Sequence, residues 1–291
     1  MSKSTKRHGT IVAAFGRHYE IGLADDTLAT GYPRGKKSPF AVGDEVELTA
    51  DGQITGHGPR RSLLYRSDAY RQKLIAANAT QLLLVVAPDP SFSDMLLSRA
   101  LVAAEHQGLT TTIVLNKCDL TPALPAARKL LAPFIALGCR VVELSARFDP
   151  SPLLPLLAGE SSVMVGQSGM GKSTLTNALV PGAAAATREL STALDSGKHT
   201  TTYARLYKLP HDTCLGGTLI DSPGLQEFGL KHLTPQQIEF GFAEFRPFLG
   251  QCRFRDCQHD AEPGCAIKEA MAAGTIHPRR LDHFRRLRAE L

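Results

Sequence analysis

The chain has 291 residues, of which 43% are hydrophobic, and a formal net charge of +5. This length favours two or three domains with a sizeable core. No apolar run follows the basic N-terminus, and no run of about 18 apolar residues occurs anywhere, so neither a secretory signal nor a membrane span is expected. We therefore expect a cytoplasmic protein without a membrane partner. The mildly basic balance is compatible with a nucleic-acid partner but does not require one.

Residues 9 to about 65 have an all-β pattern. GTIVAAFGRHYEIGLA alternates weakly, and DEVELTADGQITG predicts a hairpin that turns at Asp51 and Gly52. Short strands with Gly-rich turns are typical of a small barrel. We expect an OB-type β-barrel over residues 1–68, with an SH3-like barrel as the alternative.

Strands and helices alternate from Thr80 onward. Strands are expected at residues 81–87, 111–117, 139–146, 161–166, 203–209 and 218–224. Helices are expected at residues 93–108, 122–138 and 172–180, the first with Ser93 as its N-cap and Gly108 as its stop. This alternation predicts an α/β domain at residues 69–233, with a mostly parallel sheet covered on both faces. Residues 234–291 are expected to form a helical module that ends in a basic amphipathic helix.

The stretch GQSGMGKS at residues 166–173 fits the phosphate-loop pattern G-x-x-x-x-G-K-[ST]. It lies between an expected strand and an expected helix, which is the context that this loop requires. Its glycines let backbone N–H groups point at phosphate oxygens, and the following helix adds its positive end. Lys172 would reach the β- and γ-phosphates, and Ser173 would hold Mg²⁺. The predicted phosphate-site residues are Gly166, Gln167, Ser168, Gly169, Met170, Gly171, Lys172, Ser173 and Thr174.

The stretch DSPG at residues 221–224 follows another expected strand. Asp221 is placed to reach Mg²⁺ through a water molecule. The N–H of Gly224 would contact the γ-phosphate. The tetrapeptide is also a good turn sequence, so its meaning depends on the phosphate loop before it.

The stretch NKCD at residues 116–119 also ends a strand. Asp119 can accept hydrogen bonds from the guanine N1–H and 2-amino groups, which adenine lacks, so the site should prefer GTP and GDP to adenine nucleotides. Asn116 would brace the surrounding loops and Lys117 would lie over the base. Ser145 and Ala146 suit a backbone contact to the guanine O6.

The base-reading stretch precedes the phosphate-binding stretches, which reverses the order of an ordinary GTPase. The same site still assembles if a GTPase fold is cut between its two halves and the old ends are joined. Such joins are tolerated at surface termini. The sequence therefore predicts a circularly permuted P-loop GTPase domain.

The motif order, together with TRELSTALDSGKHTTT, DSPGLQEFGL and CRFRDCQHDAEPGCAI, resembles the bacterial family known as ribosome small-subunit-dependent GTPase A. Residues 63–90 resemble that family's join between barrel and GTPase domain. The resemblance implies an OB barrel, a permuted GTPase domain with Thr201 in its nucleotide site, and a C-terminal zinc module. It also implies GTP hydrolysis on the small ribosomal subunit and its 16S rRNA late in maturation. Lys198 departs from the family, which usually has Arg there.

Three cysteines and a histidine crowd together as Cys252-x4-Cys257-x-His259-x5-Cys265. Three thiolates and one imidazole suit a closed, tetrahedral structural Zn²⁺ site, and four protein ligands leave no open position for catalysis. Disulfides are less expected without an export signal. The other cysteines, Cys118, Cys139 and Cys214, are expected to be buried free thiols.

Basic residues gather in the parts that flank the GTPase domain, and they are candidates for rRNA contact. They are Arg34, Lys36, Lys37, Arg60, Arg61, Arg253, Arg255, Arg279, Arg280, Arg285, Arg286 and Arg288. A monomer is expected.

Leu225 follows DSPG, where many GTPases place a glutamine that orients water. Intrinsic hydrolysis should therefore be slow, with the catalytic group supplied from elsewhere. His232 is the candidate that the resemblance also favours, because imidazole can orient or deprotonate water near neutral pH. The alternatives are that His232 packs at a helix start or that His199 acts instead. Two rival functions are an RNA-binding assembly factor that the nucleotide merely regulates, and a P-loop kinase, against which NKCD and DSPG argue.

Overall fold

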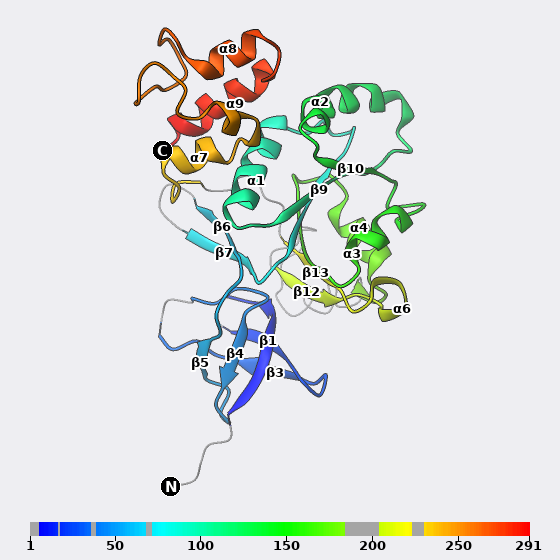
Figure 1. Cartoon of the computed structure of the whole chain (residues 1–291). Helices are drawn as coiled ribbons and strands as arrows, with labels where there is room; N and C mark the ends of the chain where they lie inside the picture. Colours follow the sequence, from blue (N-terminus) through cyan, green and yellow to red (C-terminus); the bar gives the residue numbers. More distant parts are fainter. Residues whose placement is uncertain (1–5, 17, 36–38, 68–71, 184–203, 223–229) are drawn as a thin grey trace.

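The computed structural model describes residues 6–16, 18–35, 39–67, 72–183, 204–222 and 230–291. Figure 1 shows an N-terminal β-barrel in blue, a central sheet flanked by helices, and a helical C-terminal module in orange and red. Among the described residues, no helix combines the length and the apolar character needed to cross a membrane.

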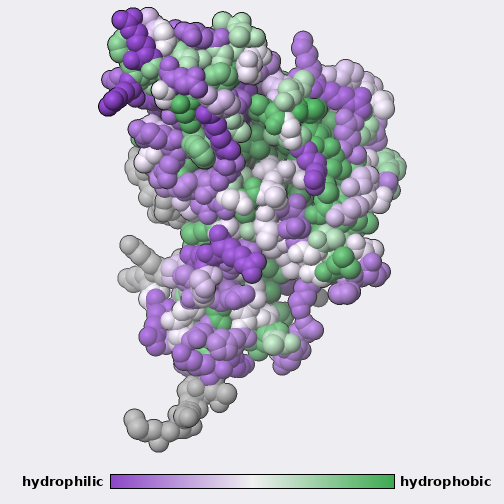
Figure 2. Space-filling model, in the orientation of Figure 1, coloured by the Kyte–Doolittle hydropathy of each residue, from purple (hydrophilic) through white to green (hydrophobic). Residues whose placement is uncertain are grey.

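The barrel consists of short antiparallel strands, as expected from the all-β pattern. They are β1(Arg7–Ala14), β2(Tyr19–Leu23), β3(Leu28–Gly31), β4(Glu45–Leu48) and β5(Ile54–His57). Strand β1 pairs with both β2 and β4. A bridge between Tyr32, just after β3, and Gln53, just before β5, links the other two strands. Gly52 has a φ of 83°, which only glycine adopts readily, so the hairpin expected at Asp51 and Gly52 is confirmed. Hydrophilic side chains cover most of the barrel face seen in Figure 2.

A two-stranded hairpin connects the barrel to the central domain. Its strands are β6(Leu63–Ser67) and β7(Gln72–Ala77), so the boundary expected after residue 68 falls between them. The Leu63 N–H donates to the Gln107 side chain at 2.8 Å, which attaches the hairpin to the end of the first long helix.

The central sheet is mostly parallel, as the alternating pattern predicts. Its strands are β8(Gln81–Val86), β9(Thr110–Leu115), β10(Arg140–Glu143), β11(Ser161–Val165), β12(Arg205–Lys208) and β13(Thr218–Asp221). The order is β10-β9-β8-β11-β13-β12, with only β12 antiparallel to its neighbour. Every residue of β8 is buried because this strand lies inside the sheet and both of its faces are covered. Strand β12 also pairs with β1, which joins barrel and central sheet.

Helices connect these strands. They are α1(Asp94–His106), η1(Thr121–Ala123), α2(Leu124–Ala136), η2(Ser151–Leu153), α3(Leu154–Leu157), α4(Lys172–Leu179) and α6(His211–Cys214). The Ser93 side chain accepts the Leu96 N–H, and Gly108 has a φ of 65°, so both expected ends of α1 are confirmed.

The C-terminal module packs against α1. It contains α7(Pro235–Phe240), η3(Ala243–Phe248), α8(Ala266–Ala272) and α9(Pro278–Ala289). A capping box formed by Thr234 and Gln237 begins α7. Phe242, Phe245 and Phe284 are fully buried and pack their rings against one another. Figure 1 shows α1 between this module and the sheet, and α9 contacts both α1 and α7.

Candidate nucleotide site and metal centre

The phosphate loop lies between β11 and α4, and its glycines are sterically required. Gly169 and Gly171 have φ values of 82° and 88°. A Cβ atom at Gly166 would lie 2.3 Å from the Val85 carbonyl oxygen, and one at Gly171 would lie 2.4 Å from Asn116 Nδ2. Larger residues would therefore push the loop away from the neighbouring strand ends.

Lys172 is the first residue of α4 and is only 8% exposed. Its Nζ donates to the carbonyl oxygens of Gly166 at 2.7 Å and Gln167 at 3.1 Å. Burial lowers the pKa of Lys172, and the nearby Asp221 carboxylate opposes that shift. Ser173 and Thr174 follow at the start of α4, and both are exposed. The loop thus holds one buried cation beside a free helix N-terminus, which suits a polyphosphate.

Asp221 ends β13, the strand beside the phosphate-loop strand β11. Its Oδ2 accepts from the Thr176 hydroxyl at 3.1 Å, while its Oδ1 is buried without a hydrogen-bond partner among the described residues. Burial raises the pKa of Asp221 to about 6. Water held by a divalent cation would satisfy this orphaned oxygen. Ser173, the expected direct ligand of that cation, lies about one helical turn before Thr176, which bonds the same carboxylate. The residues present therefore fit Mg²⁺.

Asn116 ties the base-reading loops to the phosphate loop. Its Nδ2 donates to the Met170 carbonyl at 3.0 Å, and its Oδ1 accepts the Ala146 N–H at 2.9 Å. The side chain is 1% exposed, so neither bond competes with bulk water. The bracing role predicted for Asn116 thus has a direct geometric counterpart.

Lys117 and Asp119 lie on the rim of the same site. Lys117 has a φ of 61°, and its Nζ donates to the Asp89 carbonyl at 2.8 Å. Asp119 is exposed, and its Oδ1 accepts from the Ser145 hydroxyl at 2.5 Å. Parallel strands bring these residues together because their carboxyl ends meet at one edge of the sheet.

Some of the predicted nucleotide residues face away from this site or lie outside the described residues. The Gln167 side chain accepts the Ser93 N–H at 2.8 Å and so faces α1. Ser168 is exposed on the loop. Thr201 and Gly224 lie outside the described residues, as do His199, Lys198 and Leu225.

His232 is not brought to the phosphate loop in this structure. Its ring lies 4.2 Å from that of Tyr65 and 5.6 Å from that of His106, measured between ring centroids. His106 is the last residue of α1, about 18 Å along the helix from the end that contacts the phosphate loop. Burial lowers the pKa of His232 to about 4, and its Nδ1 has no hydrogen-bond partner among the described residues. A catalytic role would require the ring to leave this packing.

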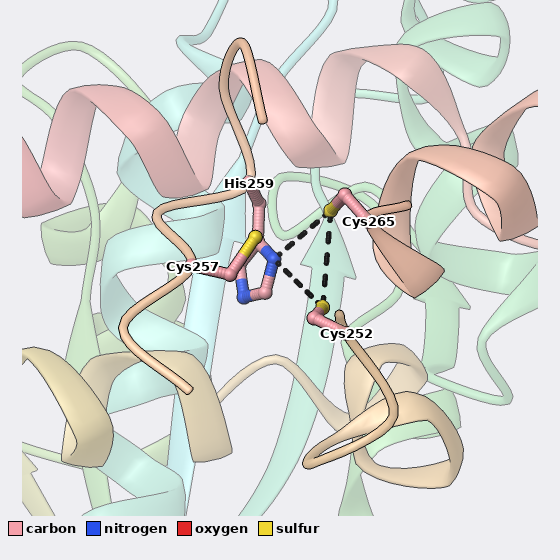
Figure 3. Close-up of side chains that lie close together, drawn as sticks. All are labelled: Cys252, Cys257, His259 and Cys265. Carbon is pink, nitrogen blue, oxygen red and sulfur yellow. Dashed lines mark hydrogen bonds between the residues drawn. The ribbon is translucent and has the colours of Figure 1, made fainter. Parts of the chain in front are cut away.

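The predicted metal ligands converge, as Figure 3 shows. One donor atom from each of Cys252, Cys257, His259 and Cys265 lies within 4.8 Å of the others. His259 Nδ1 is 3.2 Å from the Cys265 sulfur and 3.6 Å from the Cys252 sulfur, and those two sulfurs are 3.9 Å apart. Sulfur atoms around a tetrahedral zinc ion are about 3.8 Å apart, so the cluster fits that ion.

Two residues that support this cluster escaped the sequence analysis. The Glu239 carboxylate contacts His259 Nε2, which leaves Nδ1 to face the sulfurs. Arg285 donates through Nε and Nη2 to the His259 carbonyl, at 3.0 and 2.6 Å. Glu239 is on α7 and Arg285 is on α9, so no local spacing connects either to the cysteines.

Several basic residues considered for rRNA contact have structural roles instead. Arg60 pairs with the buried Asp44 at 2.6 Å, and Arg280 is 2% exposed and pairs with Glu244 at 2.5 Å. Lys36 and Lys37 lie outside the described residues. Arg34, Arg61, Arg253, Arg255, Arg279 and Arg286 are exposed.

The sequence of this chain matches that of a known GTPase family and of its members. A family model described as RsgA GTPase matches residues 57–231. The small ribosomal subunit biogenesis GTPase RsgA of Burkholderia pseudomallei (strain K96243) is 55% identical over 284 residues, covering 94% of this chain and 89% of that protein. Its namesake in Paraburkholderia xenovorans (strain LB400) is 55% identical over 287 residues, covering 95% and 91%.

Two solved structures resemble the whole chain. YjeQ from Thermotoga maritima has a TM-score of 0.73 and 31% identity, with 99% of each chain covered. YloQ, described as a circularly permuted GTPase, has a TM-score of 0.69 and 26% identity, with 98% of this chain and 95% of that chain covered. The permuted order expected from the sequence is confirmed by this likeness.

Proposed function

This chain belongs to the RsgA GTPase family, and from that premise we propose that it hydrolyses GTP on the small ribosomal subunit late in that subunit's maturation. The observation that supports this most is the bracing of both loops by Asn116, whose side chain contacts Met170 of the phosphate loop and Ala146 beside the base site. A kinase has no need for this guanine-reading half.

The nucleotide is held by residues from both halves of the permuted domain. Asp119 reads the base, Lys117 covers it, and Ser145 and Ala146 contact O6. The loop from Gly166 to Thr174 wraps the phosphates, with Thr201 and Gly224 completing the γ-phosphate side. Ser173 would bind Mg²⁺ directly and Asp221 would hold it through water, and the ion when bound would supply charge neutralisation at the phosphates. The cluster of Cys252, Cys257, His259 and Cys265 would hold one structural Zn²⁺.

His232 supplies the catalytic imidazole in this proposal. The ring must move from Tyr65 and His106 toward the γ-phosphate, and engagement of the small subunit is what moves it. In that position a neutral imidazole can accept a proton from the attacking water. The residue acts only when the subunit is present, which keeps GTP hydrolysis by the free protein slow.

The three parts divide the work. Residues 1–68 and 234–291 contact 16S rRNA, and residues 69–233 carry the switch. The chain acts as a monomer in the cytoplasm, where bacterial ribosomal subunits mature.

The decisive experiment is GTP turnover with and without purified small subunits. We expect slow hydrolysis by free protein and faster hydrolysis with subunits. His232→Ala should keep nucleotide and subunit binding but lose most of the stimulated rate, whereas His211→Ala, on the exposed α6, should not. Absence of stimulation in the parent would favour an RNA-binding factor that the nucleotide only regulates. Parental turnover by His232→Ala would assign catalysis to His199 or to rRNA.

A further inference from the structure

The phosphate loop is bonded to the start of α1. The Ser93 N–H donates to Gln167 Oε1 at 2.8 Å, while the Ser93 hydroxyl accepts the Leu96 N–H at 3.4 Å. The first N–H groups of a helix lack partners within the helix, so such caps fix where the helix begins. A side chain from the phosphate loop is therefore part of the end structure of α1.

The next residue of α1 faces the C-terminal module. Asp94 Oδ2 lies 3.1 Å from Arg279 Nη1, and Asp94 Oδ1 lies 3.6 Å from His283 Nε2. Both partners belong to α9. The end of α1 that contacts the phosphate loop is thus also the end that contacts α9.

One turn later, Ser98 extends the same contact in a buried setting. Arg280 Nη1 donates to the Ser98 hydroxyl at 2.5 Å, and that hydroxyl lies 2.7 Å from His283 Nδ1. Because the hydroxyl accepts from Arg280, its proton is free to bond Nδ1, which leaves the His283 N–H on the side of Asp94.

Arg280 itself is rigidly held. Its Nε and Nη2 donate to the two Glu244 oxygens at 2.5 and 3.3 Å, and its guanidinium lies 4.4 Å from the Phe242 ring centroid. Buried charge-assisted networks of this kind tolerate little displacement, because a broken pair leaves an unsatisfied charge. Arg280 is thus fixed within the C-terminal module, and it holds the first two turns of α1 through its bond to Ser98.

We propose that Asp94 and Ser98 are positioning residues that couple the zinc-bearing module to the phosphate loop through the Ser93–Gln167 hydrogen bond. The coupling rests on the nucleotide site proposed above. Backbone N–H groups of residues 167–173 bind the phosphates, so the loop backbone sets where the Gln167 side chain lies. Binding free energies are linked reciprocally, so a partner that shifts α9 changes nucleotide affinity, and nucleotide changes partner affinity.

The test is nucleotide affinity of the full-length, zinc-loaded chain, measured by titration with fluorescent GDP. Asp94→Ala keeps the Ser93 cap and Gln167 but removes both contacts with α9. We expect its affinity to fall about 3- to 30-fold. Arg279→Ala removes the shorter contact from the exposed side of α9 and should have the same direction of effect. Arg286→Ala is the matched control, since Arg286 pairs with Asp282 on its own helix, and its affinity should stay within about 2-fold of the parent.

A double-mutant cycle separates coupling from general damage. If the effect passes through Gln167, then Asp94→Ala should have little further effect in a Gln167→Ala background. Parental affinity in both Asp94→Ala and Arg279→Ala, or an undiminished Asp94→Ala effect in that background, would overturn the inference. Failure of the parent to bind guanine nucleotide would instead refute the proposed function.

Discussion

Asp119 stands at the rim of the base site, with one carboxylate oxygen already bonded to Ser145 at 2.5 Å. That bond orients the carboxylate for the two donors of guanine. Asp119→Asn should reduce GTP affinity by roughly 100-fold or more, because two charge-assisted hydrogen bonds are lost, and should improve xanthosine triphosphate, whose 2-keto group suits an amide donor. Competition against fluorescent GDP measures both changes. Asp212→Asn, exposed on α6 at the opposite edge of the sheet, is the control. Unchanged GTP affinity in Asp119→Asn would contradict the guanine assignment.

The packing of His232 makes stability depend on pH. Its pKa in the folded chain is about 4, against an ordinary value of 6.5, because burial opposes its charge. As the pH falls, the unfolded chain therefore binds this proton before the folded chain does. The contribution of the neutral His232 to the free energy of unfolding is complete well above pH 6.5 and is lost as the pH drops toward 4. Allowing for partial exposure of the ring, the loss between pH 7.5 and pH 5 should be about 1 kcal/mol.

This pH effect can be isolated by comparing the pH-dependent loss of stability in two proteins. Urea unfolding of the parent and of His232→Gln at pH 7.5 and 5 should show a smaller pH-dependent loss in the variant, whatever its absolute stability. Equal losses in the two proteins would mean that His232 does not titrate in the packed position against Tyr65 and His106.

Helix α7 supports the metal centre through the side chain of Glu239. Its carboxylate fixes the His259 ring, so Glu239→Gln should keep the fold but weaken zinc binding about 10-fold. Competition with a chromogenic chelator measures this, and Glu269→Gln on the exposed surface of α8 should bind as the parent does. Cys257→Ser should lose the ion altogether. Full zinc content with parental affinity in Cys257→Ser would remove the cluster from the metal assignment.

The elements that carry their own local signals could be predicted from the sequence. Strand β8 is a continuous apolar run, and α1 has its cap at Ser93 and its stop at Gly108. The phosphate loop and the four metal ligands were found by spacing. What spacing cannot reveal is contact between distant segments. The Glu239 bond to His259 spans 20 residues, and the Ser98 bond to Arg280 spans 182. The Tyr65 ring likewise packs against the His232 ring, which lies far away in the sequence.

Gln167 shows why a motif does not settle the role of each of its members. The phosphate-loop pattern requires glycines, a lysine and a hydroxyl, because those groups contact phosphate or permit the turn. The second position carries no such requirement, so its side chain is free to serve the neighbouring helix. The same holds for Arg60 and Arg280, whose charges suggested an RNA surface but which neutralise Asp44 and Glu244 inside the fold.

Exposed basic residues occur in the parts that flank the central domain as well as in that domain, and the flanking ones predict how the molecule meets the small subunit. Contacts with rRNA phosphates release counterions, so affinity should fall as salt rises, and binding should be strongest with GTP or a non-hydrolysable analogue. Arg253 and Arg255 are exposed beside the metal cluster. Replacing both with alanine should weaken subunit binding and reduce the slope of log affinity against log salt by about 1 to 2.

A second double variant shows whether the location of the two charges or only the net charge of the protein determines subunit binding. Arg128→Ala with Lys129→Ala removes the same charge from the exposed face of α2 in the central domain, and should leave the slope nearly unchanged. Sedimentation of each protein with purified small subunits over a salt series gives both slopes. Equal slopes for the two double variants would mean that only overall charge matters and that the C-terminal module does not contact rRNA through this surface. Binding indifferent to both nucleotide and salt would point to a ribosomal protein as the contact, because a protein surface does not release counterions as a phosphate backbone does.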